Sequence, residues 1–190
     1  MKCLLCENLS WTHICRSCED TFLHPILSKR KLLPNIEVLS FYKYSEIKNL
    51  LHTKHTDLGF YIYSLLAKKA LSKFAKEFTY PNPVAAIPID DMPMSAYSHT
   101  ALLAKALMSP SIEPLYNKLR ARNRVSYAGK SKEFRLKNPR NFELKAFAQQ
   151  EVILVDDIIT TGFTLTQAVH TLQAHNKEVL FCLTLADAKL

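Results

Sequence analysis

Two adjacent acids and a group of hydroxyl side chains lie close together near the carboxyl end of the sequence. Asp156 and Asp157 follow an apolar run, and the loop after them contains Thr160, Thr161, Gly162, Phe163 and Thr164. Backbone amides and threonine hydroxyls can hold a phosphate monoester, and a glycine lets the backbone approach the anion closely. Two carboxylates beside a phosphate would repel it unless they accept hydrogen bonds from sugar hydroxyls or face a divalent cation. The stretch therefore predicts a site for a ribose 5-phosphate with Mg²⁺.

A strand and a helix must position this loop. Residues 152–155 form an unbroken β-branched and aliphatic run, which is typical of a parallel strand covered on both faces. Residues 163–174 carry apolar side chains at helical spacing, so the loop leads into a helix N-terminus, whose N–H groups and partial positive charge favour an anion. The acids then lie at the carboxyl end of a strand, where open α/β sheets bind ligands. The alternative is an ordinary strand–turn–helix in which Asp157 or Thr160 caps the helix.

Four of the five cysteines form two Cys-x-x-Cys pairs near the N-terminus, Cys3 with Cys6 and Cys15 with Cys18. Each pair can present two thiolates to one ion, and two pairs supply the four sulfurs of a closed, structural zinc site. Disulfides are the alternative, which the lack of a secretory signal disfavours. Cys182 lies in an apolar run and is predicted to be a small buried side chain.

The rest of the chain alternates predicted strands and helices. A helical face begins at residue 47, helices are expected over 59–78, 95–108 and 163–174, and strands near 38–44, 84–89, 112–116, 152–155 and 178–185. This alternation predicts an α/β fold, a mainly parallel sheet flanked by helices with right-handed crossovers. The predicted organisation is a zinc-binding module over 1–24, a connector over 25–36 and the α/β domain over 37–190.

Positive charge is concentrated in the middle of the chain. Residues 118–145 contain ten Lys or Arg and two Glu, a local net charge of +8 that equals the formal charge of the whole protein. Cations with interspersed aromatic rings are typical of single-stranded nucleic-acid surfaces, and the candidate DNA-binding residues are Arg120, Arg122, Arg124, Lys130, Lys132 and Arg135. The alternative is a solvated loop whose cations only steer an anionic ligand.

The composition is that of a globular protein, with 48% hydrophobic and 22% charged residues. No apolar run approaches the roughly 18 residues that a membrane span needs. Because no apolar signal core follows Met1, a cytoplasmic protein is expected, with peripheral association with the inner membrane as an option.

The pattern over 152–164 resembles the binding motif of type I phosphoribosyltransferases, which hold 5-phosphoribosyl 1-pyrophosphate (PRPP). Four hydrophobic residues, two acids, two hydrophobic residues and Thr-Thr-Gly-x-Thr make up the motif. The resemblance implies that Asp156 and Asp157 contact the ribose 2′ and 3′ hydroxyls, and that residues 160–164 cradle the 5′-phosphate. It also implies a pyrophosphate loop after an early strand, for which the loop 53–59 with Lys54 is the candidate.

The order of cysteine pairs, basic middle and PRPP motif is similar to the ComF family of bacterial competence proteins along nearly the whole chain. Arg135, Asn138 and Phe142 match the Arg-x-x-Asn…Phe spacing of that family. The chain departs from the family at Ser95-Ala-Tyr-Ser-His99, where an Arg-Gly-Phe-Asn-Gln run is usual, and at Tyr127, where Gln is usual. If that run shapes the second-substrate site, transferase activity does not follow from the resemblance.

Two functions from different classes follow from these resemblances. The first is a PRPP- and Mg²⁺-binding, phosphoribosyltransferase-like protein that takes part in DNA uptake and handles single-stranded DNA during natural transformation, with other competence proteins as possible partners. The second is an active phosphoribosyltransferase that acts on a nucleobase or another small acceptor. In the second case a nucleophile displaces pyrophosphate from C1 of the ribose, and no general base is identified in the sequence.

Overall fold

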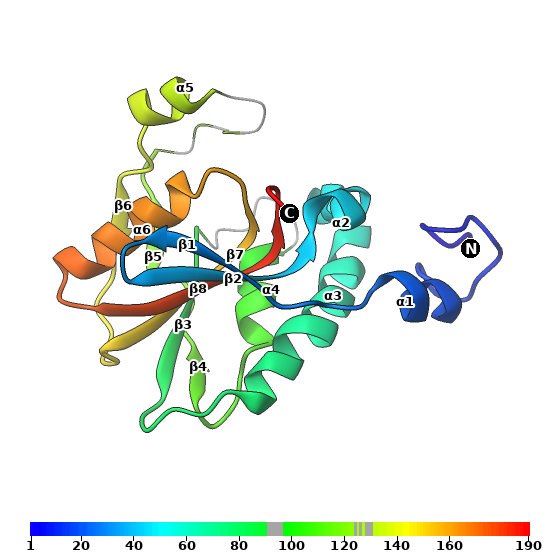
Figure 1. Ribbon diagram of the computed structural model, residues 1–190, viewed down its shortest axis with the longest axis horizontal. Coiled ribbons are helices and arrows are strands. Elements are labelled where there is room, and N and C mark those ends of the chain that lie inside the picture. The colour runs from blue at the N-terminus through cyan, green and yellow to red at the C-terminus, as the bar shows by residue number, and fades with distance from the viewer. Residues whose placement is uncertain (91–96, 124, 126, 128–130) are drawn as a thin grey trace.

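The computed structural model describes residues 1–90, 97–123, 125, 127 and 131–190, apart from the side chain of Lys132. A six-stranded sheet with the order β1-β2-β8-β7-β3-β4 forms its centre (Figure 1). All neighbouring strands are parallel except β1 and β2, which are antiparallel. The strands are β1 (Ser28–Leu33), β2 (Ile36–Lys43), β3 (Val84–Pro88), β4 (Ile112–Pro114), β7 (Glu151–Ile159) and β8 (Glu178–Asp187). The predicted α/β fold with a mainly parallel sheet is confirmed.

Side chains of β7 alternate between two cores, one on each face of the sheet. Val152 and Leu154 pack in the core that contains the buried side of α6, and Ile153 and Val155 pack in the core that contains the buried sides of α2, α3 and α4. This explains why the predicted strand reads as an unbroken apolar run. The helices are α2 (Tyr44–Leu51), the 3₁₀ helix η1 (His52–His55), α3 (Asp57–Glu77), α4 (His99–Lys105) and α6 (Phe163–Ala174).

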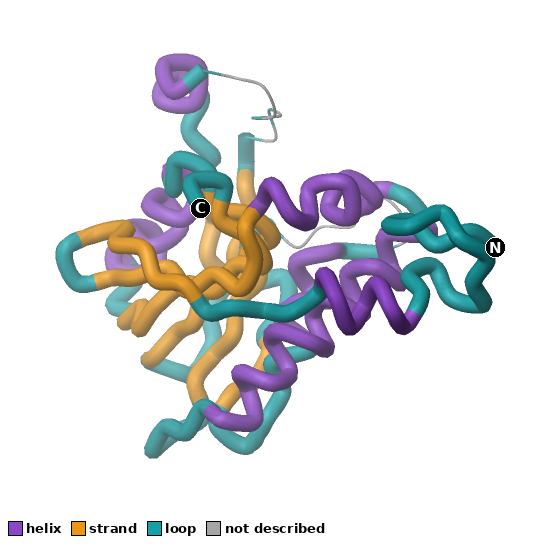
Figure 2. Tube along the Cα trace, turned by 45° about the vertical axis from the view of Figure 1, so that its right-hand side comes forward, coloured by secondary structure: helices purple, strands orange, loops and turns teal. Residues whose placement is uncertain are grey.

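A second, two-stranded sheet rises beside the main sheet and carries a short helix away from the body of the molecule (Figures 1 and 2). Antiparallel strands β5 (Leu119–Ala121) and β6 (Phe142–Leu144) form the sheet, and α5 (Lys132–Lys137) is the helix. Leu119 and Phe142 pack against the α6 core, so the sheet is anchored on that face. We call the described residues of 117–145 the arm. It contains most of the basic stretch.

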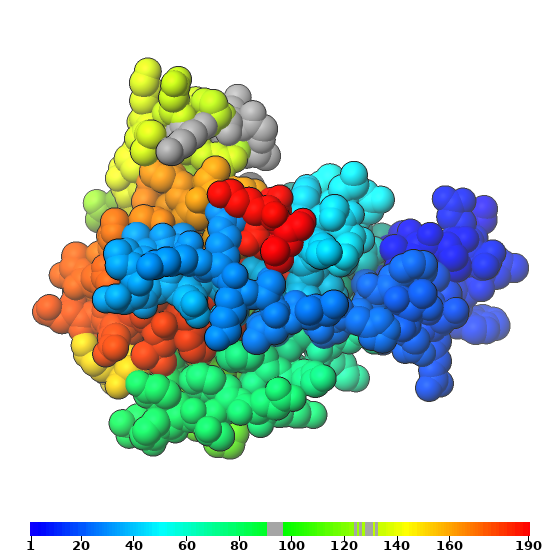
Figure 3. All heavy atoms as spheres, viewed as in Figure 1, coloured from blue at the N-terminus to red at the C-terminus, as the bar shows by residue number. Residues whose placement is uncertain are grey.

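The N-terminal residues form a small module that projects from the opposite end of the molecule (Figure 3). It contains α1 (Arg16–Phe22), and it lies beside α3, where Lys69 is 3.1 Å from Glu19 and the rings of His13 and Tyr61 are in contact. The arm and this module thus lie at separate ends of the protein (Figures 1 and 3).

The stretch 25–36, predicted as a connector, contains strand β1, and the prediction is wrong for residues 28–33. Lys29 and Lys31 are exposed on an edge strand, whereas the alternating residues Arg30 and Leu32 point toward the protein. Lysines are common on edge strands because they discourage further pairing. The connector prediction therefore missed a strand whose inward side chains, Arg30 and Leu32, reach the hydroxyl loop.

Several element boundaries also differ from those predicted. Strand β7 continues to Ile159, so both acids belong to the strand, and β8 continues to Asp187. Residues 53–55 of the predicted loop belong to η1, and the described part of the helix predicted over 95–108 begins at His99. Ser95 and Ala96 lie outside the described residues. Within the described ranges, no helix combines the length and apolar character needed to cross a membrane.

Candidate functional site

The candidate site is a pocket of about 470 Å³ at the carboxyl ends of β3 and β7. Its walls come from β7 and the following loop, from η1, from the end of β3 and from the arm, and they include Asp156, Asp157, Thr160, Thr164, Lys54, Asp90, Tyr127 and Arg135. A smaller adjoining hollow is lined by Thr161, Gly162 and Phe163. The structure therefore brings together all the residues predicted to bind PRPP, although Lys54 is distant from the others in sequence.

Asp157 is the buried centre of a charged network. The residue lines the pocket but is only 6% exposed. One carboxylate oxygen, Oδ2, lies 2.9 Å from Lys54 Nζ, accepts a hydrogen bond of 3.2 Å from the Tyr63 hydroxyl and is 3.6 Å from His99 Nε2. Burial alone would raise the pKa of Asp157, but Lys54 and His99 outweigh it and lower the pKa to about 2. Asp157 is therefore ionised and already paired.

Asp156 is half-buried and lines both the pocket and the smaller hollow. Its Oδ1 accepts a hydrogen bond of 2.8 Å from the backbone N–H of Asp157. Burial, together with the charge of Asp157, raises the pKa of Asp156 well above its usual range. Such a group holds its charge at a cost, which a sugar hydroxyl or a cation in the pocket would relieve. Of the two acids, Asp156 is the one placed to meet a ligand.

The hydroxyl loop ends at Gly162, which has φ of +83° and stands immediately before α6. The N–H of Phe163 donates to Thr161 Oγ1 at 3.4 Å. Arg30 of β1 supports the loop from behind, because its Nη2 donates to the carbonyl of Thr160 at 2.9 Å and its Nη1 lies 2.9 Å from Asp187. The loop is thus fixed by the edge strand as well as by its own turn.

Replacing Gly162 with alanine is expected to destabilise the protein by about 1–3 kcal/mol, because alanine rarely adopts this φ. A Cβ at this position would also lie 2.6 Å from Leu32 Cδ1. Denaturant unfolding of Gly162→Ala, with Leu32→Ala and the double variant as controls, measures the two contributions. The double variant should recover only the part of the lost stability that is due to the contact with Leu32. Full recovery would show that the φ angle costs nothing.

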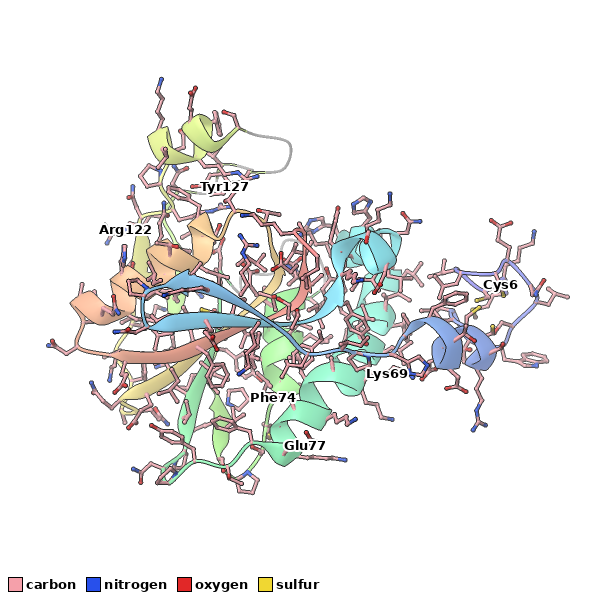
Figure 4. The ribbon with its side chains drawn as sticks, viewed as in Figure 1. Cys6, Lys69, Phe74, Glu77, Arg122 and Tyr127 are labelled. Atoms are coloured by element: carbon pink, nitrogen blue, oxygen red, sulfur yellow. The ribbon has the colours of Figure 1, made fainter. Side chains whose placement is uncertain are left out.

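Arg135, assigned to a DNA surface from the sequence, reaches into the pocket. Its Nη1 donates to Thr160 Oγ1 at 3.1 Å and to Thr161 Oγ1 at 3.4 Å, and its Nη2 donates to the carbonyl of Tyr127 at 3.1 Å. The arm therefore contributes a guanidinium to the hydroxyl loop. The Tyr127 ring, seen below α5 in Figure 4, has the Arg140 guanidinium 4.1 Å from its centroid.

The other candidate DNA-binding residues do not form one described surface. Arg122 is exposed on the arm and its Nε lies 3.3 Å from Glu143 Oε2 (Figure 4). Arg120 is half-buried and donates to Asn117 Oδ1. Lys132 belongs to α5, and Arg124 and Lys130 lie outside the described residues.

Three residues of the site were missed in the sequence. His99 lies in the segment that departs from the ComF pattern, and burial lowers its pKa against the opposing charge of Asp157. Tyr63 stands at an inward position of a long amphipathic helix, where an aromatic residue normally signals core packing. Arg30 was attributed to a connector. Only His99 could have been found from the sequence, because it is an ionisable residue in the segment 95–99, where the chain departs from the ComF pattern.

The four N-terminal cysteines lie together, as their spacing predicts. Their four sulfur atoms are all within 4.8 Å of one another, and Cys6 Sγ is 3.7 Å from Cys15 Sγ (Figure 4). A tetrahedral zinc ion with Zn–S bonds of about 2.3 Å places its sulfurs about 3.8 Å apart. Backbone N–H groups of Leu5 and Cys15 donate to Cys3 Sγ, which favours a thiolate. The cluster could therefore hold one zinc ion. Cys182 is fully buried in the core, as predicted.

Purified protein is expected to contain one zinc per chain, and Cys6→Ser with Cys15→Ser should remove it. Because a module of this size has little core of its own, loss of the metal should unfold residues 1–22 while the sheet persists. Metal analysis with limited proteolysis checks this, and Cys182→Ala should keep the zinc. A metal-free double variant with a protease-resistant module would contradict a structural role for the ion.

Comparisons with known proteins give one family match and several similar solved structures. A family model described as the phosphoribosyl transferase domain matches residues 102–189, which include the arm, β7, the hydroxyl loop, α6 and β8. The fold is phosphoribosyltransferase-like. No match was found among proteins with curated functions.

Solved structures with some similarity include three phosphoribosyltransferases. A hypoxanthine phosphoribosyltransferase from Staphylococcus aureus has 19% identity and a TM-score of 0.40, with 66% of this chain and 62% of that chain covered. An orotate phosphoribosyltransferase from Aeropyrum pernix has 15% identity and a TM-score of 0.40, with 90% and 80% covered. An adenine phosphoribosyltransferase from Trypanosoma brucei, in complex with AMP, pyrophosphate and ribose-5-phosphate, has 15% identity and a TM-score of 0.46, with 86% and 87% covered. The chain thus spans slightly less than two thirds of the Staphylococcus aureus protein.

Proposed function

We propose that this protein binds PRPP in the pocket between β7 and the arm and transfers its phosphoribosyl group to a small acceptor. The observation that carries the proposal is the convergence of Asp156, the hydroxyl loop and Lys54 on one pocket of about 470 Å³. Each group matches one part of the ligand. The loop and the α6 N-terminus suit the 5′-phosphate, Asp156 suits the ribose diol, and Lys54 suits the pyrophosphate.

Transfer in such a site depends on orientation and charge. The acceptor nucleophile forms a bond to C1 of the ribose as the C1–O bond breaks, and the electron pair leaves with pyrophosphate. The loop and Asp156 would hold the sugar in place, and Lys54 with neighbouring His55 would stabilise the departing anion. Tyr127 and Phe142 of the arm line the pocket and suit a flat acceptor.

Mg²⁺ is part of this proposal because the donor chemistry fits it. The pocket contains the carboxylates of Asp156 and Asp90, and Mg²⁺ prefers oxygen ligands shared between one or two carboxylates and the phosphates of a substrate. Asp157 is a less suitable Mg²⁺ ligand, since Lys54 and Tyr63 already contact its Oδ2. When bound, the ion would neutralise phosphate charge and favour departure of pyrophosphate.

Calorimetric titration with PRPP, with and without Mg²⁺, tests the binding. Saturable binding that Mg²⁺ strengthens supports the proposal, and no heat at millimolar PRPP would reject it. Incubation with PRPP and a panel of purines, pyrimidines and small amines, with pyrophosphate release as the readout, then tests transfer. PRPP binding without release for any acceptor would favour a binding protein over an enzyme.

The resemblance to the ComF family supports a second proposal, a role in DNA uptake and single-stranded DNA handling during natural transformation. The supporting observation is the local charge of +8 over 118–145, although Arg135 faces the pocket. Candidate contacts are then Arg120, Arg122, Arg124, Lys130 and Lys132. This proposal includes a cytoplasmic or peripheral membrane location and competence proteins as partners. It also includes the division of the chain into a zinc-binding module over 1–24, a connector over 25–36 and an α/β domain over 37–190.

Fluorescence titration with a labelled single-stranded oligonucleotide at several salt concentrations tests the second proposal. Arg122→Ala and Arg124→Ala should weaken binding and flatten its salt dependence, because each removes a cation that displaces counterions. Asp156→Ala should leave DNA affinity unchanged. An affinity indifferent to salt and to both arginines would exclude the arm as the DNA surface.

A further inference from the structure

In the described part of the chain, Arg120, Arg135 and Arg140 all lack a carboxylate within 4.0 Å, and Arg135 is the one of the three that contacts the hydroxyl loop. Arg30 pairs with Asp187 and Arg122 pairs with Glu143, whereas no carboxylate among the described residues lies within 4.0 Å of Arg135. Its Nη1 donates instead to two neutral hydroxyls of the loop, those of Thr160 and Thr161. The positive charge of Arg135 therefore lies against the loop with no carboxylate of the described residues within 4.0 Å.

The Nε donor of this guanidinium supports the same conclusion. Arg135 Nε, like Arg120 Nε, is buried and has no hydrogen-bond partner in the described part of the chain, but only Arg135 of the two lines the pocket. Buried donors are nearly always satisfied, so an unpaired N–H beside a polar pocket indicates a place where a ligand atom completes the geometry. A phosphate has several charged oxygens, and it accepts from a guanidinium more strongly than a hydroxyl does.

Arg135 is also linked to Tyr127, another residue of the arm that lines the pocket. Its Nη2 donates to the carbonyl of Tyr127, and its guanidinium lies 5.6 Å from the centroid of the Tyr127 ring. Tyr127 lines the part of the pocket that the proposed function gives to the acceptor. A phosphate that holds Arg135 would therefore fix Tyr127 as well.

We propose that Arg135 is a direct ligand of the 5′-phosphate, and that phosphate binding positions the arm and its Tyr127 over the sugar. This inference rests on the proposed function and deepens it. The protein should accordingly select phosphorylated sugars, because the arm is held in place by the phosphate and not by the ribose. The arginine assigned to DNA from the sequence thereby becomes a substrate ligand.

The test compares affinities for ribose 5-phosphate and for pyrophosphate, the two halves of PRPP, in Arg135→Met, Arg135→Lys and Lys137→Met. Lys137 is the matched control, because it is an exposed cation on the same helix. Arg135→Met should weaken ribose 5-phosphate binding about 10- to 100-fold and leave pyrophosphate affinity unchanged, as expected for a lost charge-assisted hydrogen bond. Arg135→Lys should recover part of the loss, and Lys137→Met should behave as wild type.

Ribose 5-phosphate affinity within about threefold of wild type in Arg135→Met would overturn the inference. So would equal losses for both probes, which indicate a general disturbance of the fold. These outcomes are distinct from failure of the proposed function, in which the wild-type protein itself binds neither PRPP nor ribose 5-phosphate, and the inference falls with it.

Discussion

Asp156→Ala is expected to weaken PRPP binding about 100-fold or more while the protein remains folded. Asp156 faces the pocket and its backbone partner is the N–H of Asp157. Hydrogen bonds to a charged group contribute about 1.5–3 kcal/mol each, and this side chain is expected to accept from a ribose hydroxyl and to meet Mg²⁺. Calorimetry with PRPP in the presence of Mg²⁺ measures the loss.

Stability should change little in this variant, which separates it from a folding defect. The raised pKa of Asp156 means that its charged form is disfavoured in the folded protein. Removing the carboxyl group removes this cost to folding and also removes its contacts, so the two effects oppose each other. Glu151→Ala is a matched control, since Glu151 begins the same strand at the end away from the pocket. Wild-type PRPP affinity in Asp156→Ala would place the ligand elsewhere in the molecule.

The location of this site could be predicted because it depends on local sequence. The apolar run 152–155, the acids after it and the glycine before α6 are neighbours in the chain, and their spacing alone gives strand, loop and helix start. The cysteine pairs are equally local, and the four sulfurs gather as expected. In both cases the chemistry and the structure are encoded within fewer than twenty residues.

The remaining parts of the site come from segments that the fold brings in from a distance. Arg30 reaches Thr160 only because β1 pairs antiparallel with β2 at the edge of the sheet, whereas residues 25–36 are predicted from the sequence as a connector. Arg135 lies in a strongly basic stretch, and composition cannot tell which of several cations turns inward. Local charge predicts that this region attracts anions, and the tertiary fold determines which of its cations can reach the pocket.

Lys54→Met is expected to destabilise the protein by about 3 kcal/mol at neutral pH. It leaves the carboxylate of Asp157 buried without its closest cation, 2.9 Å away in the wild type. Breaking a buried pair by removing one partner costs about 3–5 kcal/mol, and the lower end applies because the Lys54 side chain is 29% exposed. Denaturant unfolding at constant ionic strength measures the difference.

The reverse substitution should cost less. Asp157→Asn keeps the shape of the side chain and leaves the charge on Lys54, which is partly exposed and can turn toward water. The double variant Lys54→Met with Asp157→Asn should be more stable than Lys54→Met alone, since no buried charge remains. Equal stabilities for Lys54→Met and wild type would show that the pair contributes nothing to folding.

The pH dependence gives an independent test of the same pair. Because the folded pKa of Asp157 is lowered to about 2, its contribution to stability is present above the unfolded value of 3.8 and is lost as pH falls through about 2. Without Lys54, burial dominates and raises that pKa, so protonation of Asp157 becomes favourable in the fold. The destabilisation in Lys54→Met should therefore be largest at pH 7 and shrink toward pH 4. A destabilisation that is constant over this range would mean that Lys54 acts through packing and not through its charge, and its assignment to the pyrophosphate would lose support.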